Sequence, residues 1–331
     1  MCKADLTPCP PLPQGEGERT PNTLPVIRGS GGPAVRQSGS FLLALVLAVA
    51  GGATAQERTI QRGLAVNPDV SFRVYSLAGS IRVEGWDRDS ISVTATLTAG
   101  STDRFFFGGT RTGGKLGIDA GDEEEQPPAH LLLRVPPRAR VWIKSGSADV
   151  VLLGLTGGVD VFATSGSIRF DGSPDQLNLE SMDGTIDANA EGSWIRLKTA
   201  SGDITLRGTG EDVGLSTVSG NLTVLSTGLR RTRVESVSGA VAFRGGLARD
   251  GGLTVETHSG AADLQFPSDL GAEFDLSTYQ GTITSSFPNS PAPRHEQSGS
   301  ALRFTSGAGR ATVTVRTFKG VIVLKAKNVQ R

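Results

Sequence analysis

The sequence predicts an all-β protein, a single-chain parallel β-solenoid (β-helix) with about 18–21 residues per coil, preceded by a small β capping segment. Three observations lead to this fold class. A glycine, mostly preceded by serine, recurs at that spacing through the second half of the chain. Apolar residues alternate with polar residues on both sides of these glycines, as in strands with one buried face. Glycine is also abundant, with 44 among 331 residues, whereas aromatic residues make up only 5%.

Residues 1–55 are predicted to be a secretion signal rather than part of the fold. The apolar run Phe41–Ala50 is followed by a small-x-small pattern that ends at Ala55, so we expect cleavage there and a mature chain beginning at Gln56. The run is short for a bilayer span, and an uncleaved N-terminal anchor is the alternative. The acidic, Pro-rich stretch before it is atypical of a signal peptide, which indicates an over-extended N-terminus with a more normal start at Val35.

The location predicted for the mature chain is extracytoplasmic, either periplasmic, secreted or at the cell surface. Both cysteines precede residue 56, so the mature chain has no disulfide and depends on hydrogen bonding and core packing. The 33 basic and 33 acidic residues balance, so the net charge gives no reason to expect nucleic acid or an anionic membrane as a partner. No transmembrane span is expected in the mature chain.

Residues 56–137 form a less regular N-terminal β segment. Apolar residues alternate on both sides of Gly79, and a further strand is expected over 91–97. The segment is either a first, atypical coil or a capping sheet. It is expected to cover one end of the solenoid and to prevent edge-to-edge association.

The solenoid repeats are expected over residues 138–327, followed by a tail at 328–331. Each repeat is predicted to be a strand, a glycine kink and a second strand, because a kink requires positive φ or close backbone approach. An antiparallel sandwich with a hairpin at each Ser-Gly is the alternative. The last gap, 39 residues, is close to two periods, and a Pro-rich surface loop is expected within it at 286–310. The predicted kinks are Gly146, Gly166, Gly184, Gly202, Gly220, Gly239, Gly260, Gly281 and Gly320.

The recurring pattern S-G-x-I-x-V resembles the repeat of a bacterial putative-adhesin β-strand-repeat domain family of unknown function. The stretch from Ser80 to Asp87, SIRVEGWD, is similar to the opening strand and turn of that family, and Leu133–Pro137 is similar to its strand ending in proline. The resemblance extends over roughly residues 70–327. It implies an exported, non-catalytic envelope or surface protein with adhesin-like architecture, without catalytic residues or cofactors.

Three motifs that suggest ligand chemistry have simpler structural interpretations. Gly109–Lys115 has the glycines and lysine of a phosphate loop, but Leu116 stands where Ser or Thr must hold magnesium, so a hairpin tip is expected. The consecutive acids Asp122–Glu125 lack the alternating ligand spacing of a calcium loop and are expected to be solvated. No zinc site is expected, since the histidines share no ligand spacing; they are His130, His258 and His295.

A polysaccharide-active solenoid enzyme, a glycoside hydrolase or polysaccharide lyase, is the alternative to a non-catalytic protein. Counted from the glycines, Asp149 and Asp187 are expected in one outward row, two coils and about 9–10 Å apart, with Arg169 between them. That separation suits an inverting glycosidase. Alternating charges on adjacent strands are also what a stacked ladder favours, so no catalytic residue is assigned.

The outward residues also predict a binding surface. Trp142 and Phe162 stand four residues before Gly146 and Gly166 and are expected to be neighbours on adjacent coils. Exposed aromatic pairs stack on sugar rings or bind a protein partner, unless the N-terminal segment packs over them. We therefore predict an adhesin-like or envelope scaffold or binding module, whose unknown ligand is an envelope or surface glycan or protein. A second alternative, from the resemblance alone, is an envelope-stress accessory protein that binds a membrane partner.

Overall fold

The computed structural model describes residues 57–98, 102–119, 127–296 and 299–327. These residues belong to one compact unit, and their regular structure consists of 23 β-strands without a helix. The predicted all-β class is therefore confirmed. Within these residues there is accordingly no helix long and apolar enough to cross a membrane. The predicted secretion signal at 1–55 and the tail at 328–331 lie outside the described residues.

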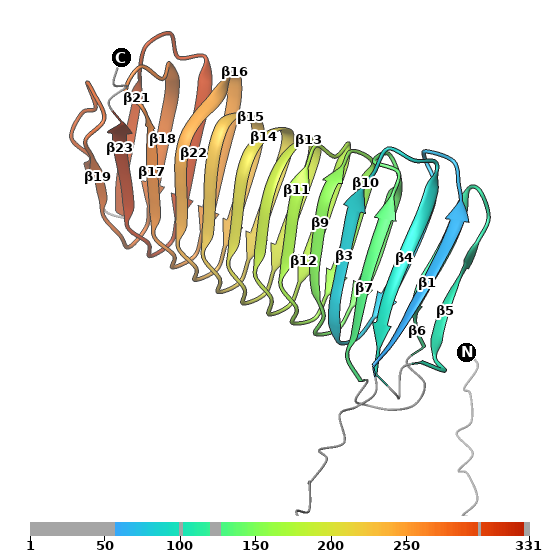
Figure 1. The fold of residues 1–331 in the computed structure, drawn as a ribbon. Coiled ribbons are helices and arrows are strands. Elements are labelled where there is room, and N and C mark those ends of the chain that lie inside the picture. The colour runs from blue at the N-terminus through green and yellow to red at the C-terminus, as the bar shows by residue number, and fades with distance from the viewer. Residues whose placement is uncertain (1–56, 99–101, 120–126, 297–298, 328–331) are drawn as a thin grey trace, which may run out of the picture. The chain divides into compact units, whose positions relative to one another are not determined.

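Each coil of the solenoid adds one strand to each of two walls, and the strands of a wall lie side by side along the stack (Figure 1). Wall A consists, in spatial order, of β5 (Phe105–Gly109), β6 (Gly113–Ile118), β2 (Ser71–Ser76), β8 (Arg140–Ser145), β10 (Gly158–Ala163), β12 (Gln176–Ser181), the second halves of β13 (Ile186–Thr199), β14 (Ile204–Thr217), β15 (Leu222–Ser236) and β16 (Val241–Thr257), then β22 (Ala311–Thr317), β18 (Ala272–Thr278), β21 (Gly299–Thr305) and β20 (Arg294–Glu296). Wall B consists of β1 (Arg58–Ala65), β4 (Ser90–Leu97), β7 (Ala129–Val135), β3 (Gly79–Gly85), β9 (Asp149–Leu155), β11 (Ile168–Gly172), the first halves of β13 to β16, then β17 (Ala262–Pro267), β23 (Ile322–Lys327) and β19 (Ile283–Ser285). Neighbouring strands are parallel throughout the middle of the stack, as a solenoid requires and a hairpin sandwich does not.

Neighbouring coils pair in register, which buries the same positions in every coil. In β13 and β14, Ile186 pairs with Ile204 and Leu197 with Leu215, an offset of 18 residues. These four side chains are at most 1% exposed, and alternate residues point outward. The predicted alternation is confirmed, and the inward rows of Ile, Leu and Val form one continuous core.

The repeating glycines are required by close backbone approach and not by an unusual backbone angle. In spatial order they form one column: Gly166, Gly184, Gly202, Gly220, Gly239, Gly260, Gly320 and Gly281. A Cβ atom added to any of them would lie less than 3.0 Å from a carbonyl oxygen of the adjacent coil, closer than real Cβ atoms approach. None of them has a positive φ; such values occur instead at the other corner of the coil, at Gly208 and Gly245. Of the two reasons expected for glycine at the kink, close approach therefore applies.

Gly146 lies in the turn between β8 and β9, where an added Cβ atom would lie 2.6 Å from the carbonyl oxygen of Leu77, but it is not in register with this column. Ile168 pairs with Val150, which places Ala148 against Gly166. Gly146 precedes Gly166 by 20 residues, whereas the register of β9 and β11 is 18; the spacing alone did not reveal the shift, because true members of the column are up to 21 residues apart. Outward residues counted from Gly146 are consequently two positions out of their predicted rows.

A buried hydroxyl closes most of these turns three residues before the column position; Ala163, before Gly166, is the exception. Thr199 Oγ1 donates to the carbonyl oxygen of Gly202 at 2.5 Å, and the Gly220 N–H donates to Thr217 Oγ1 at 3.0 Å. These bonds satisfy polar groups that the turn would otherwise bury unpaired. The row of buried hydroxyls contains Ser76, Ser145, Ser181, Thr199, Thr217, Ser236, Thr257, Thr317 and Thr278. Ser145, which belongs to this row, stands three residues before Ala148, in agreement with the register found at that coil.

The chain does not stack its coils in sequence order at either end. The C-terminal coil, β22 and β23, lies between the coil of β16 and β17 and the coil of β18 and β19. Gly320 consequently stacks on Gly260, and Gly281 stacks on Gly320. At the other end, the coil of β2 and β3 lies between the coil of β6 and β7 and the coil of β8 and β9. The 39-residue gap between Gly281 and Gly320 is therefore an excursion and a return, not two successive periods.

Antiparallel strands cover both ends of the core. β1 and β4 extend wall B beyond β7, and β5 extends wall A beyond β6, so the 56–137 segment contains both coils and capping strands. At the C-terminal end, β21 pairs with β18, and β20 pairs with β21. The prediction of a surface loop over 286–310 is therefore wrong where these two strands lie. Leu302 is 1% exposed, and Phe304 stacks on Phe274 with ring centroids 4.7 Å apart. The Pro-rich run at the start of the segment concealed this short apolar alternation.

Candidate ligand-binding face

Four aromatic side chains lie in a row on the outward side of wall A, near its N-terminal end. We call Phe106, Tyr75, Trp142 and Phe162 the aromatic row. The ring centroids of successive members are 6.3, 5.3 and 5.9 Å apart. Gly117 of β6 lies between Phe106 and Tyr75 and lets the two rings meet across it. All four rings are half-buried, so part of each remains accessible.

Trp142 and Phe162 are in contact, but not in the arrangement predicted. Trp142 is directly opposite Asp160, and Phe162 is opposite Lys144, so the two rings are diagonal neighbours. The offset follows from the position of Gly146 outside the glycine column. The contact persists because diagonal pairs on adjacent strands are within reach of large aromatic side chains. The N-terminal strand β2 lies beside β8 in the same wall, and Tyr75 of β2 and Phe106 of β5, which lies beyond β6, extend the row.

A hollow of about 640 Å³ opens beside Trp142. It lies over Gly158 of β10, whose missing side chain leaves space between Arg140 on β8 and Gln176 on β12. A Cβ atom added to Gly158 would lie 3.8 Å from Arg140 Cγ, an ordinary contact, so the space can hold a larger group. The polar lining of the hollow comes from Ser71, Arg73, Arg140, Asp160, Asp175 and Gln176.

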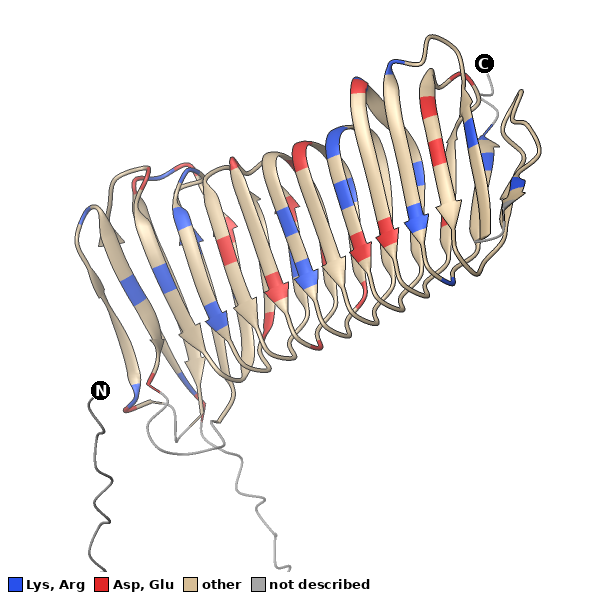
Figure 2. Ribbon diagram, turned by 180° about the vertical axis from the view of Figure 1, so that it is seen from behind, with Lys and Arg blue, Asp and Glu red and all other residues tan. Residues whose placement is uncertain are grey.

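The charges on wall A are unevenly distributed, as Figure 2 shows from the side of this wall. Strands β6, β2 and β8 contain four exposed cations and no acidic residue. We call these cations, Lys115, Arg73, Arg140 and Lys144, the basic group. None of them forms an ion pair with a residue that the structure describes, although Lys115 Nζ lies 5.5 Å from the ring centroid of Phe106. The N-terminal end of wall A is therefore locally basic in a chain of zero net charge.

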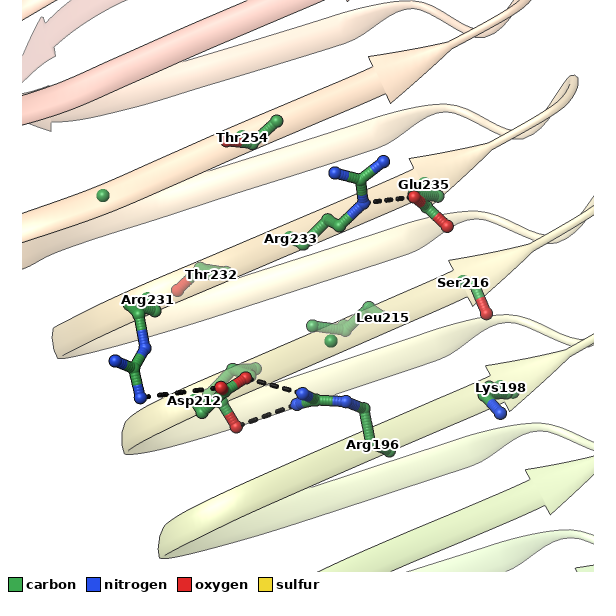
Figure 3. Close-up of a pocket in the computed structure, with 13 residues that line it drawn as sticks. Arg196, Lys198, Asp212, Leu215, Ser216, Arg231, Thr232, Arg233, Glu235 and Thr254 are labelled. Carbon is green, nitrogen blue, oxygen red and sulfur yellow. Dashed lines mark hydrogen bonds and ion pairs between the residues drawn. The ribbon is translucent and has the colours of Figure 1, made fainter.

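A second hollow on wall A, about 530 Å³ in volume, lies over Gly214 of β14 (Figure 3). Its cations are already matched by a carboxylate. Arg196 and Arg231 both contact Asp212, with N–O distances of 2.6 and 3.6 Å. Arg196 also lies over the ring of Trp194, with its Cζ 4.7 Å from the centroid. Because these arginines are already paired with Asp212, this hollow offers a ligand fewer free charged groups than the hollow beside Trp142.

An apolar ridge follows the glycine corner of the coils. The residue two positions before the column glycine points outward, and five of these side chains are 39–59% exposed: Met182, Val218, Val237, Phe318 and Tyr279. His258 stands in the same row, as expected for a corner substituent, and stacks on Phe318 with ring centroids 5.0 Å apart. Tyr279 stacks on the other side of Phe318 at 5.0 Å. Exposed apolar patches of this kind are typical of interaction sites.

The candidate catalytic carboxylates do not share a row, contrary to the arrangement expected. Asp149 lies beside Ser167, whose N–H and Oγ donate to Asp149 Oδ1 at 2.9 and 2.7 Å. Asp187 is opposite Arg169 in another row and forms an ion pair with Arg207. The structure therefore does not bring these two acids together as an inverting glycosidase requires.

Glu84, on the outward side of wall B, is held between two guanidinium groups. Arg82 Nε lies 2.7 Å from Glu84 Oε1, and Arg134 Nε lies 3.2 Å from Oε2. These hydrogen bonds, that of Arg82 first, lower the pKa of Glu84 below its ordinary value. A lowered pKa is typical of a structural ion pair and is opposite to the raised pKa of a general acid.

The other motifs singled out in the sequence have structural roles wherever they fall on residues that the structure describes. Gly109–Lys115 spans the end of β5, a turn and the start of β6, so the expected hairpin is confirmed. Asp122–Glu125 lies outside the described residues. His130 Nδ1 and Ser80 Oγ are hydrogen-bonded at 2.9 Å. In the described part of the chain, no three His, Cys, Asp or Glu side chains come close enough to hold a metal ion.

Comparison with known families agrees with the pattern of the repeats. The family model of Toastrack DUF4097 matches residues 72–325, from β2 to β23. The chain belongs to this family. The expected membership of a putative-adhesin β-repeat family of unknown function is thereby confirmed, and so is the solenoid character of the Toastrack fold.

Three solved structures from bacteria match most of this chain. A putative adhesin from Parabacteroides merdae is 8% identical to the Toastrack chain, with a TM-score of 0.51 over 82% of this chain and 97% of that one. A putative lipid binding protein from Parabacteroides distasonis has a TM-score of 0.47 and 10% identity, over 80% of this chain and 96% of that one. A putative adhesin from Bacteroides fragilis has a TM-score of 0.40 and 12% identity, over 82% and 99%. A comparison with curated proteins finds no match.

Proposed function

We propose that the Toastrack chain is an exported, non-catalytic, adhesin-like binding module that holds a surface glycan on wall A. The aromatic row supports this most directly, because Trp142 and its neighbours border a hollow lined with hydrogen-bonding groups. Sugar rings have apolar faces that stack on aromatic side chains, and hydroxyls that bond to carboxylates, amides and guanidinium groups. Membership of the Toastrack family, whose fold the Parabacteroides merdae adhesin shares, favours the same class of protein.

Export is one part of this proposal. The apolar run Phe41–Ala50 and the small-x-small pattern that ends at Ala55 favour a cleaved signal peptide and an extracytoplasmic protein, periplasmic or at the cell surface. We expect N-terminal sequencing of the exported protein to begin at Gln56. A first residue upstream of Phe41 would contradict cleavage and indicate an N-terminal anchor.

Replacing Trp142 by alanine is expected to weaken glycan binding about tenfold or more, because a central aromatic contact commonly contributes this much to an interface. The measurement is a glycan array with the exported chain, followed by titration calorimetry on the glycans that it retains. Trp194→Ala is the matched control. Trp194 is a second tryptophan on wall A, 38% exposed, that lies outside the aromatic row.

The proposal requires that Trp194→Ala keep the wild-type affinity while Trp142→Ala loses it, and equal affinities of the three proteins would overturn it. Gly158→Leu tests the hollow separately, because the new side chain would occupy the space over β10 without removing an aromatic ring. Release of shortened oligosaccharides in the same assay would instead support the polysaccharide-active alternative. Capture of an envelope membrane protein in the absence of glycan would support the envelope-stress alternative.

A further inference from the structure

We propose that the glycan held by wall A is an acidic polysaccharide, whose carboxylates bind the basic group of Lys115, Arg73, Arg140 and Lys144. This inference rests on the proposed function and specifies the ligand class for the same site. Three features support it: the cations form no ion pair with a described residue, the middle of the wall from β12 to β16 pairs its charges, and the cations are interleaved with the aromatic row.

The stability of the fold does not explain the basic group. Arg73 lies directly opposite Lys115 on a neighbouring strand, and like charges in that position destabilise a sheet. Another like-charged pair, Glu235 opposite Glu256, is bridged by Arg233, which binds both carboxylates. Among the described residues, no acid bridges Arg73 and Lys115 in this way. The two cations therefore produce a positive potential that a carboxylate of a ligand would neutralise.

The middle of wall A follows the opposite rule. Lys198 is directly opposite Glu180 with an N–O distance of 3.1 Å, and Arg231 is directly opposite Asp212. These pairs are what stacking of strands favours in the absence of a ligand. In Figure 2 the strands β6, β2 and β8 differ from this pattern, since all of their charged residues are basic. Such a segregation of charge is expected for a surface that attracts an extended anion.

The cations and the aromatic rings are interleaved across the strands. Arg73 is directly opposite Trp142, and Lys144 is opposite Tyr75. A polymer that crosses the strands therefore meets a guanidinium, an indole ring and then Asp160, at steps of about 4.8 Å, the spacing of neighbouring strands. A guanidinium group pairs with a carboxylate in a bidentate geometry, and an indole ring stacks on a sugar. This combination fits a chain of uronic acids better than a chain of neutral sugars.

Acidic residues in the hollow favour a glycan over a nucleic acid. Single-stranded nucleic acids also use cations and aromatic rings. However, Asp160 and Asp175 line the hollow beside Trp142 and would repel the phosphates, which lie in the nucleic-acid chain itself. The carboxylate of a uronic acid projects from one edge of its ring and leaves the hydroxyls of the other edge for Asp160.

The test compares oligogalacturonate with its methyl ester, which has the same rings and linkages but no charge on the carboxyl groups. Titration calorimetry of the exported chain at low salt is expected to give binding of the acid form at least about tenfold tighter. Replacing both arginines, Arg73→Gln with Arg140→Gln, is expected to abolish this preference without lowering Tm, because a like-charge contact is removed. Arg231→Gln, on the same wall but paired with Asp212, is the control and keeps the preference.

Equal affinity for the acid and the ester would overturn this inference. A preference that survives the double replacement of Arg73 and Arg140, or tighter binding of a single-stranded oligonucleotide of equal length, would overturn it as well. Trp142→Ala distinguishes these results from failure of the proposed function. If this variant weakens binding of both forms while wild type binds them equally, glycan binding stands and the acidic class is wrong. If neither form binds and the array retains no glycan, the proposed function fails and the inference fails with it.

Discussion

Replacing Gly239 by alanine is expected to lower the free energy of unfolding by about 3 kcal/mol or more. A Cβ atom on Gly239 would lie less than 3.0 Å from the carbonyl oxygen of Gly220, a backbone atom that cannot move without opening the pairing of β15 with β16. No change of rotamer relieves such a clash. It also falls in the middle of the stack, so the coils on both sides would have to shift. Chemical denaturation followed by circular dichroism measures the loss.

Gly252→Ala is the matched control for this substitution. Gly252 lies on β16 in wall A, and an added Cβ atom would meet no other atom within 4 Å. Reducing the backbone freedom of a strand glycine is expected to leave stability unchanged or to raise it slightly. Similar denaturation midpoints for the two variants would contradict the explanation of the glycine column by close backbone approach.

The repeating part of the fold could be predicted because most coils obey the same local rule. A buried hydroxyl, a glycine three residues later and alternating apolar residues recur together, and each has a separate physical cause. The register counted from Gly146 was wrong because a Ser-Gly pair alone does not set the register, although Gly146 does lie in the turn between β8 and β9. Ser145 and Ala148 show the true position, together with Val150, which stands 18 residues before its partner Ile168.

The ends of the stack could not be predicted, because their spatial order departs from the order of the sequence. The apolar alternation of β22 is the same as that of any other coil. Such a pattern shows that a strand has one buried face but does not show which strands lie beside it. The spacing between Gly281 and Gly320 was consistent with two further periods, and only the pairing of β22 with both β16 and β18 shows the insertion.

The basic group was missed for the same reason. Lys115 and Arg73 are distant in the sequence and become neighbours only because the coil of β2 and β3 stacks directly on the coil of β6 and β7. A net charge of zero gave no indication of this local excess. Trp142 and Phe162, by contrast, belong to successive coils that follow sequence order, so their contact could be predicted even though their register was wrong.

Removing the C-terminal coil is expected to unfold the coil beside it as well. A chain ending at Arg310 lacks β22 and β23, which are parallel partners of β16, β17, β18 and β19. Four fully buried side chains are removed with these strands: Val313, Val315, Ile322 and Leu324. At about 1.5–3 kcal/mol each, their burial contributes about 6–12 kcal/mol. That sum is comparable with the whole stability of a typical domain, so the coil of β18 and β19 is not expected to remain folded without it.

Hydrogen exchange tests this expectation along the chain. Each coil of a solenoid contacts only its neighbours, so the amides of β18 and β19 should exchange freely in the truncated chain while those of β13 to β15 stay protected. A chain ending at Lys327 retains both strands and is the control. A peptide of residues 311–327 is expected to restore protection of β18, because its place lies between two coils that the truncated chain still contains. If β18 stays protected without the peptide, then β16 and β18 pair directly, and the inserted order at this end reflects the route of folding rather than a requirement of the stack.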